Sequence, residues 1–420
     1  MRSLLLLACA LPLAAPSVLA APRALADVHV VAAAGGGDFT NLQVAVDAAA
    51  DGDTLLIKSG NYSLTTLANR SLTLLGDVGA NPRITRVRVQ QLAPSARVEL
   101  IGLTISSSSA VVFGSPRLDI TDCEGTVVAQ DCDINGAATP FFDAPAPGVA
   151  AVDSDAVFLI DCALAGGSGS GFGQPNGLPG AAIERSTVHV YGGTLRGGSG
   201  FTEQGPTAGV GGAGLTATES VLFLSGSHTF GGAGADGVID SIFEFSCVMG
   251  APGGAGILLL DSELTLRDVT TTPGAGGTGA PSSGCPAGVD GLPIDRSNSN
   301  LVDLPGEHRT LSVAPNPIRE GQTASVRFGG TPGDAVFWVF GFESSGSPTP
   351  LLGGPILPAA ADFVLPQGVL PPSGELIQAV GIPTLGVPIL TFFEQSLHLG
   401  SDGSVAVSTP QVVEHLSSGF

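Results

Sequence analysis

Two pairs of aspartates offer carboxyl groups for acid–base chemistry. Asp153 and Asp155 form one pair, and Asp131 and Asp133 form the other. Residues two apart in a β-strand project from the same face, so each pair would present two carboxyl groups side by side. Hydrolysis of a glycosidic bond requires such a pair. The same spacing also arises by chance in a chain with 37 acidic residues. The four aspartates are therefore catalytic candidates, but the sequence does not identify the catalytic residues.

Aromatic and charged side chains recur at fixed positions of a repeated strand pattern. Five segments begin with a serine that is followed by apolar residues two and four positions later, and they start at Ser154, Ser186, Ser220, Ser241 and Ser262. If those apolar residues point inward, the residues three and five positions after each serine point outward. The outward set, called here the outer strip, includes His189, Tyr191, Phe223, Glu244 and Arg267.

The outer strip has the composition of a carbohydrate-binding surface. Aromatic faces stack on sugar rings, and nearby polar groups fix the orientation of the ligand. The strip is therefore a candidate ligand-binding surface. The alternative is that the long glycine-rich loops of the chain cover it.

A mostly acidic set of residues stands immediately before the five serines. Its members are Asp153, Arg185, Glu219, Asp240 and Asp261. We expect them to cap the turns that lead into the strands. The alternative is a bridging cation such as calcium, because stacked carboxylates repel one another without one. Beyond this calcium alternative the sequence indicates no cofactor, and it identifies no metal ligands.

The spacing of the serines predicts how the strands are arranged. The steps between them are 32, 34, 21 and 21 residues, which suggests a unit of 21 residues with glycine-rich insertions in the first two steps. Strands at regular spacing predict a β-solenoid, and about eight to ten coils fit residues 66–295. The low-complexity residues 271–292 are expected to form a flexible outer loop.

Composition limits where the protein acts and what it binds. The first 26 residues combine an apolar run with small-residue cleavage sites after Ala20 and Ala26, which is typical of a secretory signal peptide. No other run is long enough to span a membrane. The formal net charge of −21 would repel nucleic acid and anionic surfaces. We expect an extracellular or cell-surface protein.

The five cysteines that remain after export cannot all pair within the chain. Cys123, Cys132 and Cys162 each follow an aspartate, and we expect them to be small apolar fillers at coil corners. A disulfide between Cys247 and Cys285 is the one pairing that we consider. Metal ligation is not indicated, because no histidine lies near these cysteines in the sequence.

The remaining chain divides into further segments. Residues 27–65 are expected to hold a capping helix and the first strand, because an uncapped solenoid exposes apolar side chains and strand edges. Residues 296–308 lack the strand pattern and are expected to be a linker. Turn signals about every ten residues across 309–420 predict a small antiparallel β-sandwich.

Several short motifs near the N-terminus carry a family resemblance. They are Gly37-Asp38-Phe39-Thr40-Asn41-Leu42, Ala45-Val46-Asp47-Ala48-Ala49, Gly52-Asp53-Thr54 and Gly60-Asn61-Tyr62. Residues 35–75 thereby resemble the N-terminal cap of right-handed parallel β-helix proteins of the pectin-lyase-like group, and the strand rhythm continues to about residue 295. That group includes pectate lyases, pectin methylesterases and secreted proteins without known activity. The C-terminal region resembles modules at the ends of large secreted bacterial proteins.

The resemblance implies a right-handed parallel β-helix more firmly than a reaction. Methylesterases of the group carry a Glu-Gly-Thr-Val-Asp run whose aspartate is the nucleophile, whereas here Val128 follows Glu124-Gly125-Thr126-Val127. Pectate lyases need calcium-binding carboxylates beside a basic residue, and no tight aspartate cluster flanks an arginine in the later coils. We expect a protein that contacts extracellular polysaccharide or a cell-surface component without the standard pectin-degrading groups. The alternative is a polysaccharide lyase or glycoside hydrolase of this group.

Overall fold

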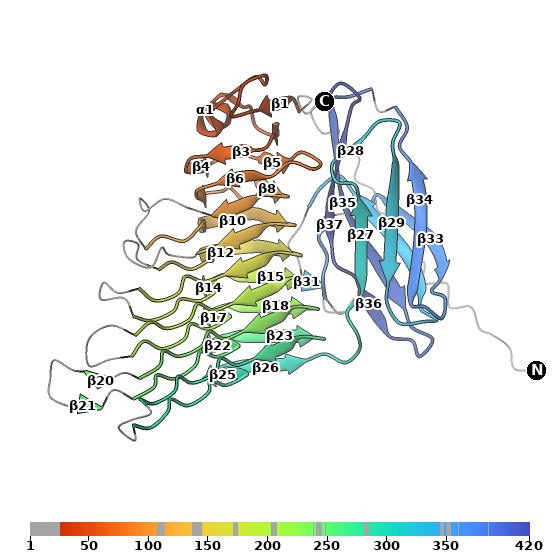
Figure 1. Cartoon of the computed structure of the whole chain (residues 1–420). Coiled ribbons are helices and arrows are strands. Elements are labelled where there is room, and N and C mark those ends of the chain that lie inside the picture. Colours follow the sequence, from red (N-terminus) through yellow and green to blue (C-terminus); the bar gives the residue numbers. More distant parts are fainter. Residues whose placement is uncertain are drawn as a thin grey trace, which may run out of the picture.

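The computed structural model shows a right-handed parallel β-helix followed by an antiparallel β-sandwich, which confirms the predicted fold class (Figure 1). It describes residues 26–106, 114–136, 145–170, 175–202, 208–237, 239–240, 246–247, 249–280, 285–344, 348–349, 354–359, 361–384 and 386–420. The predicted signal peptide lies outside the described residues, apart from its last position. No helix in the described part of the chain is long and apolar enough to cross a membrane.

Each full coil of the β-helix contributes strands to three faces. One face, called here the covered face, contains β1 Val28–Val31, β2 Thr54–Ile57, β5 Leu72–Gly76, β8 Arg97–Ile101, the second halves of β10 Leu118–Gln130 and β12 Val149–Ile160, then β15 Thr187–Tyr191, β18 Val221–Ser225, β23 Glu263–Arg267 and β26 Asn300–Asp303. The second face contains β4 Thr65–Ala68, β7 Val87–Gln90, the first halves of β10 and β12, β14 Ala181–Glu184, β17 Leu215–Thr218, β22 Ile257–Leu260 and β25 Ile294–Ser297. The third face contains β3 Gly60–Tyr62, β6 Pro82–Ile84, β9 Thr104–Ser106, β11 Asp133–Asn135, β13 Ala163–Ala165, β16 Thr194–Arg196, β19 His228–Phe230 and β24 Thr270–Thr272.

The repeated serines stack at the corner between the second face and the covered face. The backbone N–H of Ser186 donates to the hydroxyl of Ser220 at 3.2 Å, and the N–H of Ser220 donates to the hydroxyl of Ser262 at 3.1 Å. Each hydroxyl also donates to the carbonyl two residues earlier, as Ser220 does to Thr218 at 2.6 Å. This serine ladder, which also includes Ser154 and Ser299, satisfies buried backbone donors where the strands turn and lose their regular partners.

The ladder corrects the predicted unit of 21 residues. Its serine-to-serine steps are 32, 34, 42 and 37 residues. The segment from Ser241 to Phe245 lies outside the described residues. The strands on either side of it, β20 Ile239–Asp240 and β21 Ser246–Cys247, pair antiparallel with each other and not with any coil. Period-2 alternation at Ser241 does not mark a further coil, because the ladder runs from Ser220 directly to Ser262.

The glycine-rich excursions form an ordered two-layer slab at the edge between the third and second faces. The glycine slab comprises residues 166–170, 177–180, 197–202, 208–214, 231–237, 250–256, 274–280 and 286–292. Gly231, Gly234 and Gly237 donate to the next coil of their own layer, and Gly232 and Ala235 donate across to the other layer. A hydrogen-bond period of three is that of polyproline II geometry. The described part of residues 271–292 is therefore hydrogen-bonded structure, not the expected flexible loop.

The cap and the corners follow the sequence-based expectations. Helix α1 Leu42–Ala48 lies at the N-terminal end of the stack, and its residues Leu42, Ala45 and Val46 join the core of the coils. Cys123, Cys132 and Cys162 are free and buried. Cys285 is disulfide-bonded, and the side chain of Cys247, its predicted partner, lies outside the described residues.

The coils continue further than expected. Strand β25 ends at Ser297, and β26 Asn300–Asp303 pairs in parallel with β23. The last coil therefore occupies part of the segment 296–308 that was expected to be a linker. The lack of an apolar pattern there has a physical reason, because these strands are the exposed end of the stack.

The C-terminal domain consists mainly of two packed sheets. One contains β27 Thr310–Ala314, β29 Thr323–Gly329 and β34 Glu375–Gly381; the other contains β28 Ile318–Arg319, β30 Ala335–Gly341, β33 Phe363–Val369, β35 Ile389–Leu399, β36 Val405–Val407 and β37 Gln411–Leu416. A short hairpin pairs β31 Pro348–Thr349 with β32 Gly354–Pro355. Leu311, Val326 and Phe328 from the first sheet meet Val336 and Val413 from the second in the sandwich core.

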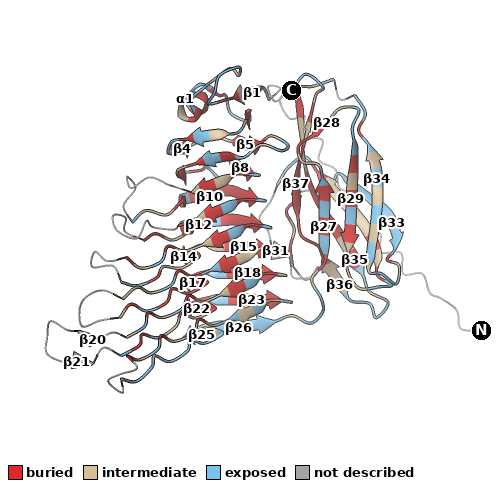
Figure 2. Cartoon of the chain, viewed as in Figure 1, coloured by how far each residue is buried: buried red, intermediate tan, exposed pale blue. Residues whose placement is uncertain are grey.

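The sandwich packs against the covered face of the β-helix (Figures 1 and 2). A continuous apolar cluster spans the two domains, with Val128, Phe158 and Tyr191 on the β-helix side and Phe393 and Val412 on the sandwich side. All five side chains are buried. The covered face is therefore buried on both sides, by the coil interior and by the second domain.

Candidate binding site at the mouth of the domain interface

The outer strip lies beneath the sandwich and is not a solvent-exposed surface. His189 is 2% exposed, Tyr191 is 1% exposed and Phe223 is 7% exposed. The Tyr191 and Phe223 rings lie 5.5 Å apart, so the predicted aromatic neighbours do meet. They contact the second domain of the same chain. The Tyr191 hydroxyl, for example, donates a hydrogen bond to the carbonyl of Pro355 at 2.9 Å. The prediction of an open glycan-binding strip was wrong, and so was the alternative that the glycine-rich loops cover it.

The inward and outward positions predicted for the strand after Ser154 were also wrong. Phe158, not Val157, aligns with His189, and their rings lie 4.8 Å apart. Asp155 and Ala156 stand between Ser154 and Val157, where the next coil has Thr187 alone between Ser186 and Val188, and this extra residue in β12 reverses the inward and outward positions that follow. Val157 therefore points into the coil interior, and Phe158 points to the sandwich.

Of the two charged residues of the outer strip, the structure describes only Arg267. Glu244 lies outside the described residues. Arg267, at the end of β23, is 5% exposed, and its Nε and Nη1 atoms have no hydrogen-bond partner. Desolvation lowers the pKa of Arg267, and the nearby Arg309 lowers it further.

The candidate catalytic aspartates do not form open carboxylate pairs. Asp153 has a φ of 50° at the corner before Ser154, and Arg185 donates to both of its oxygens at 2.7 and 3.0 Å. Asp155 is exposed beyond the buried Ser154. Asp153 is therefore neutralised by an ion pair and fixes a turn.

The second aspartate pair is divided by a corner of the coil. Asp131 adopts a φ of 53° at the end of the covered face, and Asp133 projects from β11 on the third face. Asp131 accepts a hydrogen bond from Gln130, and desolvation raises its pKa. Desolvation and the charge of Asp131 raise the pKa of Asp161, in the next coil, to about 6.

The residues before the serines act as turn residues. Arg185, Glu219 and Asp261 have φ values of 45°, 51° and 49°, the left-handed conformation that lets a strand turn sharply into the next face. Asp240 lies in the hairpin strand β20 and not in this stack. No group of three or more potential metal-ligating side chains occurs among the residues that the structure describes.

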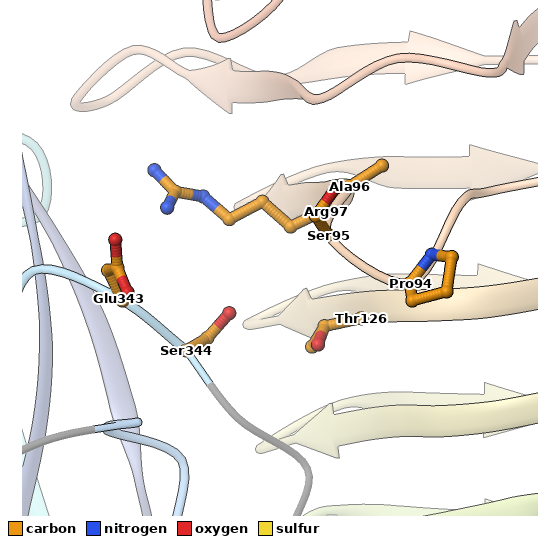
Figure 3. A pocket seen from close by; sticks show the side chains of 7 residues that line it. All are labelled: Pro94, Ser95, Ala96, Arg97, Thr126, Glu343 and Ser344. Carbon is orange, nitrogen blue, oxygen red and sulfur yellow. The ribbon is translucent and has the colours of Figure 1, made fainter. Parts of the chain in front are cut away.

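An open pocket lies at the mouth of the domain interface, where the β7–β8 loop approaches the sandwich. It has a volume of about 230 Å³ and is lined by Pro94, Ser95, Ala96, Arg97, Thr126, Glu343 and Ser344. Figure 3 shows Arg97 from β8 extending toward Glu343, which follows β30, with Ser344 and Thr126 below them. The pocket therefore presents hydroxyl, guanidinium and carboxylate groups from both domains.

A second hollow continues from the first along the same loop. It has a volume of about 470 Å³ and is lined by Ala49, Asp51, Asn69, Arg70, Ser71, Ala93, Ser95 and Ala96. Ser95 and Ala96 line both hollows. The two hollows, together called the mouth groove, extend from the end of α1 to the edge of the sandwich.

The arginines of the mouth groove are held in place by the protein. Arg97 pairs with Glu99 at 2.8 Å and lies over the Phe393 ring at 5.0 Å. Arg70 donates to the carbonyls of Val46 and Ala49 at the end of α1, at 3.1 and 2.9 Å. Fixed donors reduce the entropy lost when a ligand is bound. The groove is therefore suited to binding a polar ligand.

Sequence patterns gave no sign of the mouth groove. Ser95, Thr126 and Ser344 belong to no shared motif, and they meet only because the sandwich docks beside the β7–β8 loop. In the sequence, Thr126 stands out only as part of the Glu-Gly-Thr-Val run. Val128, which stands where methylesterases carry their nucleophile, is 1% exposed in the domain interface.

Comparisons with known proteins find distant structural likenesses. No family model matches the chain, and no curated protein matches it. The full-length tailspike protein 2 of Escherichia coli O157:H7 bacteriophage CAB120 shares 10% identity over 91% of this chain, with a TM-score of 0.27, and this chain spans 63% of its length. Pectate lyase Pel9A shares 12% identity over 66% of this chain and 79% of its own, with a TM-score of 0.21. The fold assignment therefore rests on the parallel stack of this chain's own strands.

Proposed function

We propose that this chain is a secreted or cell-surface protein that binds extracellular polysaccharide in the mouth groove, without the catalytic groups of the pectin-degrading enzymes. The observation that carries the proposal is that two polar hollows lie next to each other along one loop, with Ser95 and Ala96 lining both. A chain of sugar units is an extended ligand rich in hydroxyl groups, which suits a row of fixed donors and acceptors.

The charge of the protein indicates the class of polysaccharide. With a net charge of −21, the protein repels a polyanion at long range. The groove contains Arg70 and Arg97, but both are engaged by protein groups. We therefore infer a neutral polysaccharide, bound by hydrogen bonds and not by ion pairs.

The proposal is tested by closing the groove with one substitution. Ser95 is an exposed loop residue that lines both hollows, so Ser95→Trp would fill their junction. Binding of soluble neutral polysaccharides, screened as a panel by calorimetry, is expected to fall at least tenfold in this variant. Ser401→Trp, at an exposed turn of the sandwich, is the matched control and should bind as the wild type does.

The same panel separates binding from catalysis. Unsaturated-product absorbance and new reducing ends are measured after long incubation with each polysaccharide. Either signal, lost in Ser95→Trp, would support the lyase or hydrolase alternative. Repeating the titrations with added calcium and with a chelator tests the alternative that calcium is bound. Wild-type binding that Ser95→Trp leaves unchanged would refute the groove as the binding site.

A further inference from the structure

Arg267 is a buried cation with unsatisfied hydrogen-bonding groups. It is the last residue of β23 on the covered face, beside Ser225 of the preceding coil. The side chain is 5% exposed, and its Nε and Nη1 atoms are buried without a hydrogen-bond partner. A buried donor without a partner destabilises the folded state, and the cost is larger when the group is charged.

The surrounding charges do not neutralise Arg267. Arg309, 7% exposed, lies near it, and this second guanidinium lowers its pKa. The buried carboxylate of Asp334 is already paired with Arg309, at 2.7 Å. Asp268, the residue that follows β23, is exposed and accepts a hydrogen bond from the backbone N–H of His308.

The neighbouring histidines do not offset the positive charge of Arg267. His308 bridges the domains, with Nδ1 2.8 Å from the Ser225 hydroxyl and Nε2 3.0 Å from the Thr409 hydroxyl. Desolvation lowers the pKa of His308 to about 4, so its ring is neutral at pH 7. His398 is 3.6 Å from Asp334, and desolvation lowers its pKa to about 4 as well. The buried groups Arg267, Arg309 and Asp334 thus leave one positive charge in excess.

We propose that a small monovalent anion binds at Arg267, between the end of β23 and the sandwich. The anion would accept from one of the two Arg267 atoms that lack protein partners, Nε or Nη1, and would balance the excess charge. One negative charge is sufficient. A halide suits the site because it needs no further donors of fixed geometry, and chloride is the common ion of this class. The site stabilises the docking of the two domains, and it is independent of the mouth groove.

The test is the anion dependence of unfolding in the full-length protein. Sodium chloride and sodium methanesulfonate are compared at equal ionic strength, so that general screening is constant. Above the dissociation constant, each tenfold increase in chloride should raise the ratio of folded to unfolded protein about tenfold, because the ion binds only the folded state. Methanesulfonate, which is larger, should not have this effect.

Substitution assigns the effect to one residue. Arg267→Met removes the charge at similar volume and should abolish the chloride dependence. Arg327→Met, which removes an exposed arginine paired with Glu375, should retain it. Equal chloride dependence in Arg267→Met and the wild type, or none in the wild type, would overturn the proposal.

A direct measurement stays decisive if Arg267→Met does not fold. Crystals of the wild-type protein grown in bromide should show an anomalous peak within hydrogen-bonding distance of Nε or Nη1 of Arg267. A bromide-containing crystal without such a peak would refute the site.

Discussion

The hydroxyl of Tyr191 in β15 donates a hydrogen bond of 2.9 Å to the carbonyl of Pro355 in β32, which is 164 residues later in the chain. This contact joins the aromatic part of the β-helix to the second domain. Beside it, a Cβ on Gly354 would lie 3.2 Å from the Phe223 ring, so the β32 backbone lies close to the aromatic side chains. The sandwich thus occupies the surface that a sugar would need.

Tyr191→Phe should weaken domain docking without altering the coils. The loss is expected to be about 1 kcal/mol, the usual net contribution of one hydrogen bond, because Gln395 still donates to the Pro355 carbonyl at 3.3 Å. Urea unfolding measures the loss, and limited proteolysis of residues 304–308 reports domain opening. Tyr62→Phe is the control, because its hydroxyl contacts only N-terminal groups such as the Lys58 carbonyl. Equal cleavage of the two variants would contradict this role for Tyr191.

The strand repeat was predictable because it reflects local physics. The serine ladder needs a small hydroxyl at one corner of each coil, and the next strand must place leucine or valine inside, as with Leu222 and Leu224 after Ser220. The error at Ser241 and the reversal at Ser154 have the same origin. Alternation identifies a strand, but neither its pairing partner nor a single inserted residue such as Asp155 is visible in the pattern.

The domain interface was less predictable, although it left one sign. Val157, Phe158, Leu159 and Ile160 form an uninterrupted apolar run, which is typical of a strand buried on both faces. The run indicates that something covers the face but does not say what. The mouth groove had no such sign, because Ser95 and Ser344 come together only through the docking of two domains.

Ser220→Ala should destabilise the β-helix by about 1–3 kcal/mol, since it leaves the buried N–H of Ser186 without its acceptor. Amide hydrogen exchange at Ser186 should accelerate more than exchange in the sandwich. Ser220→Cys is the matched control. Cys123 occupies the equivalent corner three coils earlier and directs its thiol to the carbonyl of Thr121 at 3.4 Å. The ladder is not stabilising in the way described if the alanine and cysteine variants unfold at the same urea concentration.

Gly254→Ala should open the glycine slab locally. A Cβ at this position would collide with the carbonyl oxygen of Gly212 in the preceding coil. The backbone N–H of Gly254 donates across the slab to the carbonyl of Gly232 at 2.8 Å, so the segment cannot shift without losing that hydrogen bond. We expect faster exchange and faster proteolysis across residues 231–280. Ala255→Ser, one residue away at a partly exposed position, should leave both rates unchanged, and a similar effect of the two variants would argue against close packing of the slab.

Domain docking should weaken as the pH rises toward 8, because of Glu414. This residue of β37 is fully buried at the interface, where Thr391 donates to one of its oxygens at 2.9 Å and the other has no partner. Desolvation, and then repulsion from the buried Glu99, raises the pKa of Glu414 from 4.5 to about 8. Glu99 accepts from Thr73 at 2.7 Å and pairs with Arg97.

The sign of the effect follows from proton linkage. Between pH 4.5 and about 8 the folded state binds a proton at Glu414 that the unfolded state has released, so stability falls as the pH rises through this range. Glu414→Gln keeps a neutral side chain at every pH, and it should reduce the slope of unfolding free energy against pH by up to one proton. Glu394, whose pKa desolvation also raises to about 8, contributes a further slope of the same sign. Glu375→Gln, which removes an exposed carboxylate of the surface pair with Arg327, should leave the slope unchanged. Urea midpoints measured from pH 5 to pH 9 test whether Glu414 is protonated in the folded protein. An unaltered slope in Glu414→Gln would mean that this carboxyl group is ionised in the docked protein.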